Sequence, residues 1–186
     1  MIIRPSVPED AGTVIPLLYS AIGSIAFLLT GTSEPETALS AMKEWYQRSG
    51  NRLSYANVLV AENEGKPVGA ALFYHGSQIA ELDRPLLERL AAKNGSAPSS
   101  FPVEAKKNEF YLDSLAVSPE CQGRGIGSLL MKAFEAEGKR RGYERVALIV
   151  SSDKPRAKKL YSDQGYAVDE QLEIAGASYD HMVKQL

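Results

Sequence analysis

The residues of this chain that are best suited to chemistry lie in a glycine-rich segment, Gln122-Gly-Arg-Gly-Ile-Gly127, that follows an apolar run. Its three glycines stand at alternate positions, and a helical pattern begins among them at Ile126. The first amides of a helix have no intrahelical acceptor and lie at the positive end of the macrodipole, so a glycine-lined helix start can bind an anion. The segment is therefore a candidate site for phosphate or pyrophosphate. The alternative is that its glycines serve only close packing.

A strand and a helix must position this loop. Phe110–Val117 is rich in aromatic and β-branched residues and stops before Pro119, which predicts a buried strand. Apolar residues then recur at helical spacing from Ile126, and basic residues in the last turn, Lys139 to Arg141, precede a stop at Gly142. The sequence thus predicts a strand, a glycine loop and a helix in succession.

Two familiar phosphate motifs do not fit this loop. A Walker loop needs Gly-Lys followed by Ser or Thr, whereas Gly138-Lys139 continues with Arg140. A dinucleotide fingerprint needs glycine or alanine where this chain has Ser128, and an acidic residue about twenty positions further on. The chain has the apolar run Val146 to Val150 in that region.

The order Leu115-Ala-Val117, Pro119 and Gln122–Gly127 closely resembles the acetyl-CoA-binding signature of the GNAT superfamily of N-acetyltransferases. In that signature Gln or Arg is followed by two residues, Gly, one residue, and Gly or Ala. Further along, Ala157-Lys-Lys-Leu160-Tyr161 followed by Gly165-Tyr166 is similar to the second signature of the superfamily. The resemblance is specific from Phe110 to Tyr166 and only general before that stretch.

The resemblance implies an α/β fold of the α+β type, with a mixed, mostly antiparallel twisted sheet of about six to seven strands flanked by helices. It also implies acetyl-CoA as the acyl donor, with the main chain of the strand along the pantetheine arm. The implied cofactor-binding residues are Leu115, Ala116, Val117, Gln122, Gly123, Arg124, Gly125, Ile126, Gly127, Ser128 and Lys158. Lys158 belongs to a basic helix face with Lys154 and Arg156, for which exposure to solvent is the alternative.

Acetyl transfer to an amine also needs a proton for the departing thiolate and a base for the amine. The resemblance implies that Tyr161 is the general acid; otherwise it would be a core tyrosine. Period-two alternation with Leu115 brings Asp113 to the cofactor side of the strand, which makes it a candidate base. Glu109 and a water molecule are the other candidates, and Asp113 could instead be a structural carboxylate.

The remaining elements follow from periodicity and from glycine and proline stops. They comprise six strands and four helical stretches. Two of the strands form an early hairpin with a positive φ at Gly65, and two form a terminal hairpin around Gly176. The expected ranges are Ile2–Arg4, Ala11–Leu29 broken near Gly23 and ending at Gly31, Glu34–Arg48, Val58–Glu62, Val68–Phe73, Gln78–Lys93, Arg145–Val150 parallel to the strand at Phe110, a helix capped by Asp153 and ended by Gly165, Tyr166–Leu172 and Ala177–Val183.

Residues 75–108 form an insertion between the third and fourth strands, relative to the compact pattern of the superfamily. It combines the helix with a loop rich in Gly, Ser and Pro. Segments of this length without regular structure are usually functional or disordered. The alternatives for this one are a cover over the acceptor pocket and a contact in a homodimer.

Composition narrows the class of protein. The 186 residues suit one domain, 1–186, and 44% hydrophobic with 24% charged residues is typical of a globular chain. A net charge of −2 gives no general attraction to nucleic acid. The one cysteine, Cys121, fits a reducing compartment, and with His75 and His181 it forms no metal-ligand spacing, so no metal site is expected. The apolar run Val14–Leu29 is too interrupted to span a membrane, and a cytoplasmic location is expected.

Together these observations predict an N-acetyltransferase that moves the acetyl group of acetyl-CoA to a primary amine by direct attack in a ternary complex. A small-molecule acceptor is expected. The alternatives are a protein or peptide N-acetyltransferase and a non-catalytic acyl-CoA-binding sensor.

Overall fold

Alternating burial along one strand shows how the two faces of the sheet are covered. In β3 (Lys66–His75), Ala70 and Leu72 belong to one apolar core, while Ala71 and Phe73 belong to a second core on the opposite face. Successive strand residues point to opposite faces, so β3 must be covered on both sides. This two-sided burial explains why the strand reads as a continuous apolar run in the sequence.

The computed structural model describes residues 1–174 and 176–186, and these form a seven-stranded sheet in the order β1-β2-β3-β4-β5-β7-β6. The remaining strands are β1 (Ile2–Pro5), β2 (Val58–Asn63), β4 (Phe110–Val117), β5 (Arg145–Ser151), β6 (Ala167–Ile174) and β7 (Ala177–Gln185). Neighbouring strands are antiparallel except β4 and β5, which are parallel. The expected mixed, mostly antiparallel sheet is confirmed.

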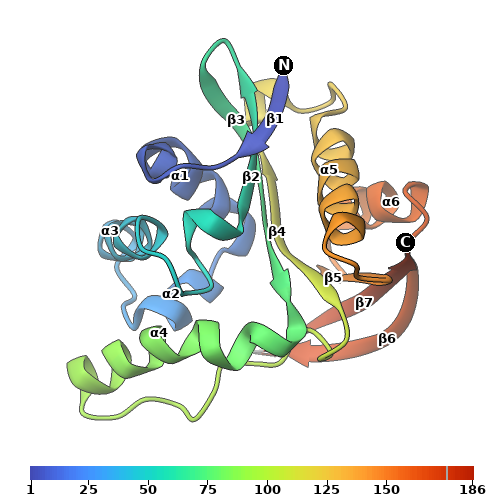
Figure 1. Ribbon diagram of the computed structural model, residues 1–186. Helices are drawn as coiled ribbons and strands as arrows, with labels where there is room; N and C mark the ends of the chain where they lie inside the picture. The colour runs from blue at the N-terminus through green and yellow to red at the C-terminus, as the bar shows by residue number, and fades with distance from the viewer. Residues whose placement is uncertain (175) are drawn as a thin grey trace.

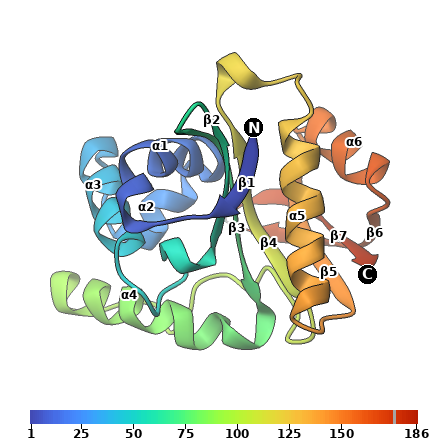
Figure 2. The ribbon, with the colours of Figure 1, turned by 45° about the horizontal axis from the view of Figure 1, so that its top comes forward.

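Helices cover both faces of the sheet (Figure 1). The helices α1 (Ala11–Ile22), α2 (Ile25–Thr30) and α3 (Pro35–Tyr46) lie on one side, where they share a core with Leu72. The helix α5 (Ile126–Arg140) lies on the other side, together with α6 (Pro155–Asp163), as Figure 2 also shows. Among the described residues, no helix combines the length and the apolar character needed to cross a bilayer.

Glycines that the sequence predicts to end helices or to form turns do so in the structure. Gly23 separates α1 from α2 with φ 55°, and Gly31 ends α2 with φ 63°. Gly65 has φ 79° in the β2–β3 turn, as predicted. The predicted cap of α6 is wrong, because Lys154 occupies the N-cap position and Asp153 instead accepts a hydrogen bond from the Ser151 hydroxyl.

The insertion contains the helix α4 (Ile79–Asn94), close to the predicted range. Its two ends are joined at Gly76, whose N–H donates to the Glu109 carbonyl at 2.8 Å. The loop after α4 returns to the protein and buries Phe101 and Ala105, which are 3% and 6% exposed. The insertion is thus closed at its base and packs against the body of the protein.

Candidate active site

The strands β4 and β5 separate halfway along their length. Their pairing runs from Phe110 opposite Val146 to Leu112 opposite Leu148, although β4 continues to Val117 and β5 to Ser151. A cavity of about 390 Å³ lies at this opening, lined by residues 113–115 of β4 and 149–151 of β5. The β4 edge that faces the opening can bond an extended ligand through its backbone, as an added strand would.

The glycine loop lies at the end of β4 and begins α5. Gly123 and Gly125 have φ 74° and 78°, and a Cβ added to either would meet no atom within 4 Å. The first helical bond of α5 runs from the Leu129 amide to the Gly125 carbonyl at 3.1 Å, so the amides just before it have no helical acceptor. An open loop with free amides at a helix start fits a phosphate group.

The other loop residues have different surroundings. Gly127 packs toward α6, because a Cβ there would lie 3.3 Å from the Leu160 side chain. Gln122 is exposed and its Nε2 donates to the Val117 carbonyl at 3.1 Å, which ties the loop to the end of β4. Arg124 is exposed, whereas Ile126 is buried in the core beneath the loop. The loop is thus anchored from below and open above.

The helix α6 brings Tyr161 to the wall of the cavity. Burial raises the pKa of the Tyr161 phenol to about 12, so the group stays protonated at neutral pH. The phenol forms no hydrogen bond among the residues that the structure describes, which leaves it free to donate to a ligand. Lys158, which the resemblance assigns to cofactor binding, has its Nζ 2.5 Å from Asp180 of β7.

Asp113 lies at the cavity, but its carboxylate is already well bonded. It occupies a bulge in β4, since Leu72 pairs with Ser114 and the next residue of β3 pairs with Leu112. Its carboxylate accepts hydrogen bonds from Arg52 at 2.6 Å, from the Ser114 hydroxyl at 2.9 Å and from the Tyr74 phenol. Three donors therefore already occupy this carboxylate, which leaves it poorly placed to accept a proton from a ligand.

Comparison with known proteins agrees with this geometry. The family model described as the acetyltransferase (GNAT) family matches residues 24–166, which is most of the chain. The chain belongs to the GNAT acetyltransferase family. Members of this family use acetyl-CoA as the acyl donor, and this GNAT protein is an acyl-CoA-dependent acetyltransferase.

Three solved structures illustrate how far the likeness extends. A crystal structure described only as an acetyltransferase is 29% identical, with a TM-score of 0.81 and coverage of 100% of this chain and 99% of that one. An N-acetyltransferase from Staphylococcus aureus Mu50 is 22% identical, with a TM-score of 0.83 and coverage of 99% and 100%. A ribosomal-protein-alanine N-acetyltransferase from Brucella melitensis is 19% identical, with a TM-score of 0.65 and coverage of 100% of both chains.

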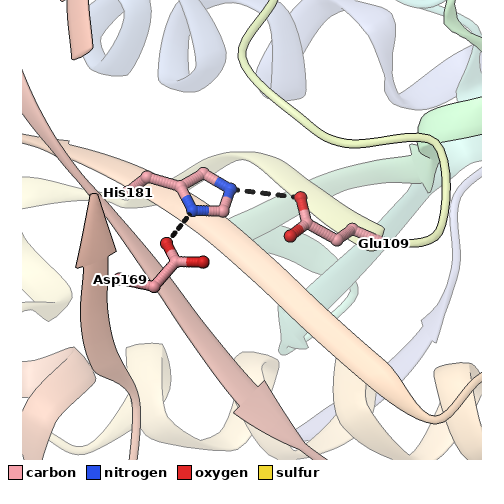
Figure 3. A group of neighbouring side chains, drawn as sticks. All are labelled: Glu109, Asp169 and His181. Carbon is pink, nitrogen blue, oxygen red and sulfur yellow. Dashed lines mark hydrogen bonds and ion pairs between the residues drawn. The ribbon is translucent and has the colours of Figure 1, made fainter. Parts of the chain in front are cut away.

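The second candidate base of this GNAT acetyltransferase, Glu109, lies outside the residues that line the cavity. Its carboxylate is 3.1 Å from Arg145 Nε and 3.1 Å from His181 Nε2, and His181 also bonds Asp169 (Figure 3). Burial works to raise the pKa of Glu109, but the bonds from His181 and the Lys106 amide outweigh it and hold that pKa below its usual range. Glu109 is therefore poorly placed to act as the base.

Glu109, Asp169 and His181 meet in the folded protein, with ligand-type atoms within 4.8 Å of one another, although no spacing in the sequence predicts this. Arg145 and Lys106 also contact Asp169, at 2.7 and 3.1 Å. Two permanent cations therefore already pair with these carboxylates. The arrangement is an ion-pair cluster that joins the segment just before β4 to β5, β6 and β7.

Two residues that the sequence analysis missed, Arg52 and Glu104, also line the cavity. Arg52 precedes β2 and contacts Asp83 of α4 at 3.4 Å as well as Asp113. Glu104 belongs to the insertion loop. No local pattern distinguishes either residue from an exposed charged one, because their burial depends on segments distant in sequence.

Proposed function

We propose that this acetyltransferase moves the acetyl group of acetyl-CoA to a small primary amine by direct attack in a ternary complex. The observation that carries the proposal is one cavity at which the free β4 edge, Tyr161 and several acidic residues meet. The donor and the acceptor can then bind side by side in one cavity, so the acetyl group can pass directly between them without a covalent acetyl-enzyme.

Binding of acetyl-CoA is assigned to two parts of the chain. The backbone amides of residues 123–128 are proposed to bind the pyrophosphate, which fits the open space above Gly123 and Gly125. The backbone of Leu115 to Val117 is proposed to bond the pantetheine arm along the unpaired edge of β4. A backbone N–H of that stretch would then face the thioester oxygen and stabilise negative charge on it.

Tyr161 is proposed to donate a proton to the departing thiolate. Its pKa of about 12, which burial causes, keeps the phenol protonated until the thiolate forms. Asp113 is proposed to position Arg52 and the strand bulge, because three donors already hold its carboxylate. This differs from the role as base that the alternation of the strand suggested.

The shape of the cavity favours a small acceptor. Residues 20–25 at the α1–α2 junction, Glu104 of the insertion and Tyr179 of β7 enclose it on the acceptor side. A protein or peptide acceptor is the alternative, and an acyl-CoA-binding sensor without turnover is a second one. The name of the Brucella protein refers to a protein acceptor, but likeness at 19% identity concerns the fold alone.

The test is calorimetric titration with acetyl-CoA, followed by assays of thiol release with agmatine, phenethylamine and a peptide that begins with alanine. A Cys121→Ser background removes the one protein thiol that would react with the detection reagent. Thiol release with agmatine or phenethylamine is expected. Release with the peptide alone would support the protein acceptor, binding without release would support the sensor, and absence of binding would contradict the assigned loop.

A further inference from the structure

Glu104 holds an unusual position among the acidic residues of the cavity. It lies in the insertion loop after α4, its side chain lines the cavity, and the residue is only 8% exposed. One carboxylate oxygen, Oε2, accepts a hydrogen bond from the Tyr111 phenol at 2.8 Å. The other oxygen accepts no hydrogen bond among the residues that the structure describes, so it is available to a ligand in the cavity.

Arg52 is the nearest cation, but it does not bond the free carboxylate oxygen of Glu104. Arg52 lies 2.6 Å from Asp113 and 3.4 Å from Asp83, and so it serves two other carboxylates. Within the described part of the chain, no lysine, arginine or histidine lies within ion-pair distance of Glu104. Three carboxylates therefore share one guanidinium, and the third is left facing the cavity. A buried carboxylate of this kind favours a ligand that brings a positive charge.

We infer that Glu104 is the base that accepts a proton from the ammonium group of the acceptor, and that this site thereby selects cationic primary amines. The inference rests on the proposed function and names the acceptor class and the missing base for it. It also gives the insertion a purpose, because the loop after α4 carries Glu104 to the cavity wall.

Glu104 and Tyr161 together account for every proton that moves in the reaction. The Glu104 carboxylate takes one proton from the ammonium group, and the neutral amine attacks the thioester carbonyl carbon. The carbon–sulfur bond then breaks, and Tyr161 protonates the thiolate. As the amide forms, the nitrogen loses a second proton, and this proton goes to the Tyr161 phenolate. Glu104 then releases its own proton to solvent. The products are the amide, free coenzyme A and one proton.

The surroundings of Glu104 support this role. Burial raises its pKa, Arg52 opposes that rise, and Asp113 and Asp83 add to it. A base with a pKa nearer to neutrality holds a proton more effectively at the working pH.

Other groups face Glu104 from several elements: Arg52 before β2, Asp83 on α4, Tyr74 on β3, Tyr111 and Asp113 on β4, and Tyr179 on β7. Burial keeps the pKa values of the three phenols above their ordinary value, and Arg52 stays charged. Asp83 also has a pKa raised by burial, but it lies outside the cavity lining. Asp113 and Asp153 also line the cavity, so an acid limb in the rate profile is assigned to Glu104 by its loss in a Glu104 variant.

The test compares Glu104→Gln with Glu88→Gln, a change at an exposed glutamate of α4. Glutamine keeps an oxygen that can accept from Tyr111, so the fold and the affinity for acetyl-CoA should be retained. For the amine with the fastest thiol release, kcat/KM of Glu104→Gln should fall by about 100-fold at pH 7. The loss should shrink as pH rises toward the pKa of the amine, because free amine then needs no base. Glu88→Gln should match the parent protein.

The possible results distinguish failure of the Glu104 inference from failure of the proposed function. A Glu104→Gln variant with parental kcat/KM, or with the same loss at every pH, would overturn the inference and leave the transferase intact. A parent protein that releases no thiol with any amine would overturn the proposed function and the inference with it. As a readout without turnover, carbon-13 titration of the carboxyl groups should show a signal, absent in Glu104→Gln, whose midpoint exceeds the usual value of about 4.3. A midpoint at or below that value would contradict the inference.

Discussion

At the scale of single residues, the cavity combines a phenol that stays protonated with carboxylates in unequal surroundings. Tyr161 lines the cavity without a hydrogen-bond partner among the described residues, and burial raises its pKa to about 12. Asp113 has three donors, whereas Glu104 has one. The Asp113 carboxylate is therefore already occupied by donors, whereas the Glu104 carboxylate has an oxygen available to a ligand.

We predict that Tyr161→Phe will lower kcat by about 100-fold, because the departing thiolate loses its proton donor. The affinity for acetyl-CoA, measured by calorimetry, should stay unchanged. The matched control is Tyr166→Phe, since Tyr166 is a neighbouring buried tyrosine, 6.4 Å away between ring centroids, that does not line the cavity. An unaltered turnover in Tyr161→Phe would remove this residue as the acid.

At the scale of elements, the unit formed by β4, the glycine loop and α5 brings the two parts of the proposed acetyl-CoA site together. The strand supplies an unpaired edge beyond Leu112, and the helix start supplies free amides about a dozen residues later. Gly125 has φ 78° at the N-cap of α5, with open space where a side chain would be. Both conformation and access therefore favour glycine at this position.

Gly125→Val should weaken acetyl-CoA binding by at least about tenfold, because the added side chain would keep the pyrophosphate away from the backbone amides of the loop. Gly142→Val is a close control at the other end of α5, with φ 80° and the same open surroundings. Both variants should lose about 1–2 kcal/mol of stability from the left-handed backbone. Only Gly125→Val should lose affinity in calorimetry. Equal affinity in the two variants would contradict the assignment of the loop.

The base of the insertion offers a second test at this scale. A Cβ at Gly76 would lie 1.9 Å from the Lys106 carbonyl oxygen, where the backbone cannot move aside easily. Gly76→Ala should therefore destabilise the protein by about 2 kcal/mol in urea unfolding. Gly12→Ala in α1, where a Cβ meets nothing within 4 Å, should be neutral or stabilising. Similar unfolding curves for the two variants would show that the insertion is not closed as described.

At the scale of the whole molecule, an ion-pair cluster joins the segment just before β4 to three strands from distant parts of the chain. Glu109 precedes β4, Asp169 lies in β6 and His181 lies in β7 (Figure 3). Arg145, which bonds Glu109 and Asp169, begins β5. Burial alone would lower the pKa of His181, but the hydrogen bonds to Glu109 and Asp169 outweigh it and raise that pKa. The folded protein therefore favours the protonated imidazole, and its stability depends on pH.

The stabilisation from His181 is complete below the pKa of an unfolded histidine, about 6.5, and is lost as pH rises through the higher folded value. His181→Gln should lower the stability by about 3 kcal/mol at pH 6, and the difference from the parent protein should shrink toward pH 9. The measurement is Tm across this range. His75→Gln is the control, since burial lowers the pKa of His75 and the trend should be reversed. A difference that stays constant with pH would contradict the charged cluster.

Much of the fold could be predicted from the sequence because its signals are local. The strand at Phe110–Val117 and the parallel strand after α5 follow from apolar runs, and Gly23, Gly31 and Gly65 mark turns through their positive φ. The glycine loop was found in the same way, since its residue types depend on its own backbone. These features need only neighbours a few residues away in the chain.

Only the tertiary structure decided which charged groups meet. Arg52 reaches Asp113 across 61 positions of sequence, and Lys158 bonds Asp180 instead of remaining free. The bulge that turns Asp113 toward Arg52 and the loop that carries Glu104 to the cavity arise from packing between distant segments. Local pattern therefore determined the elements and the proposed donor loop. The electrostatic character of the proposed acceptor side depends on burial, which exists only once the chain has folded.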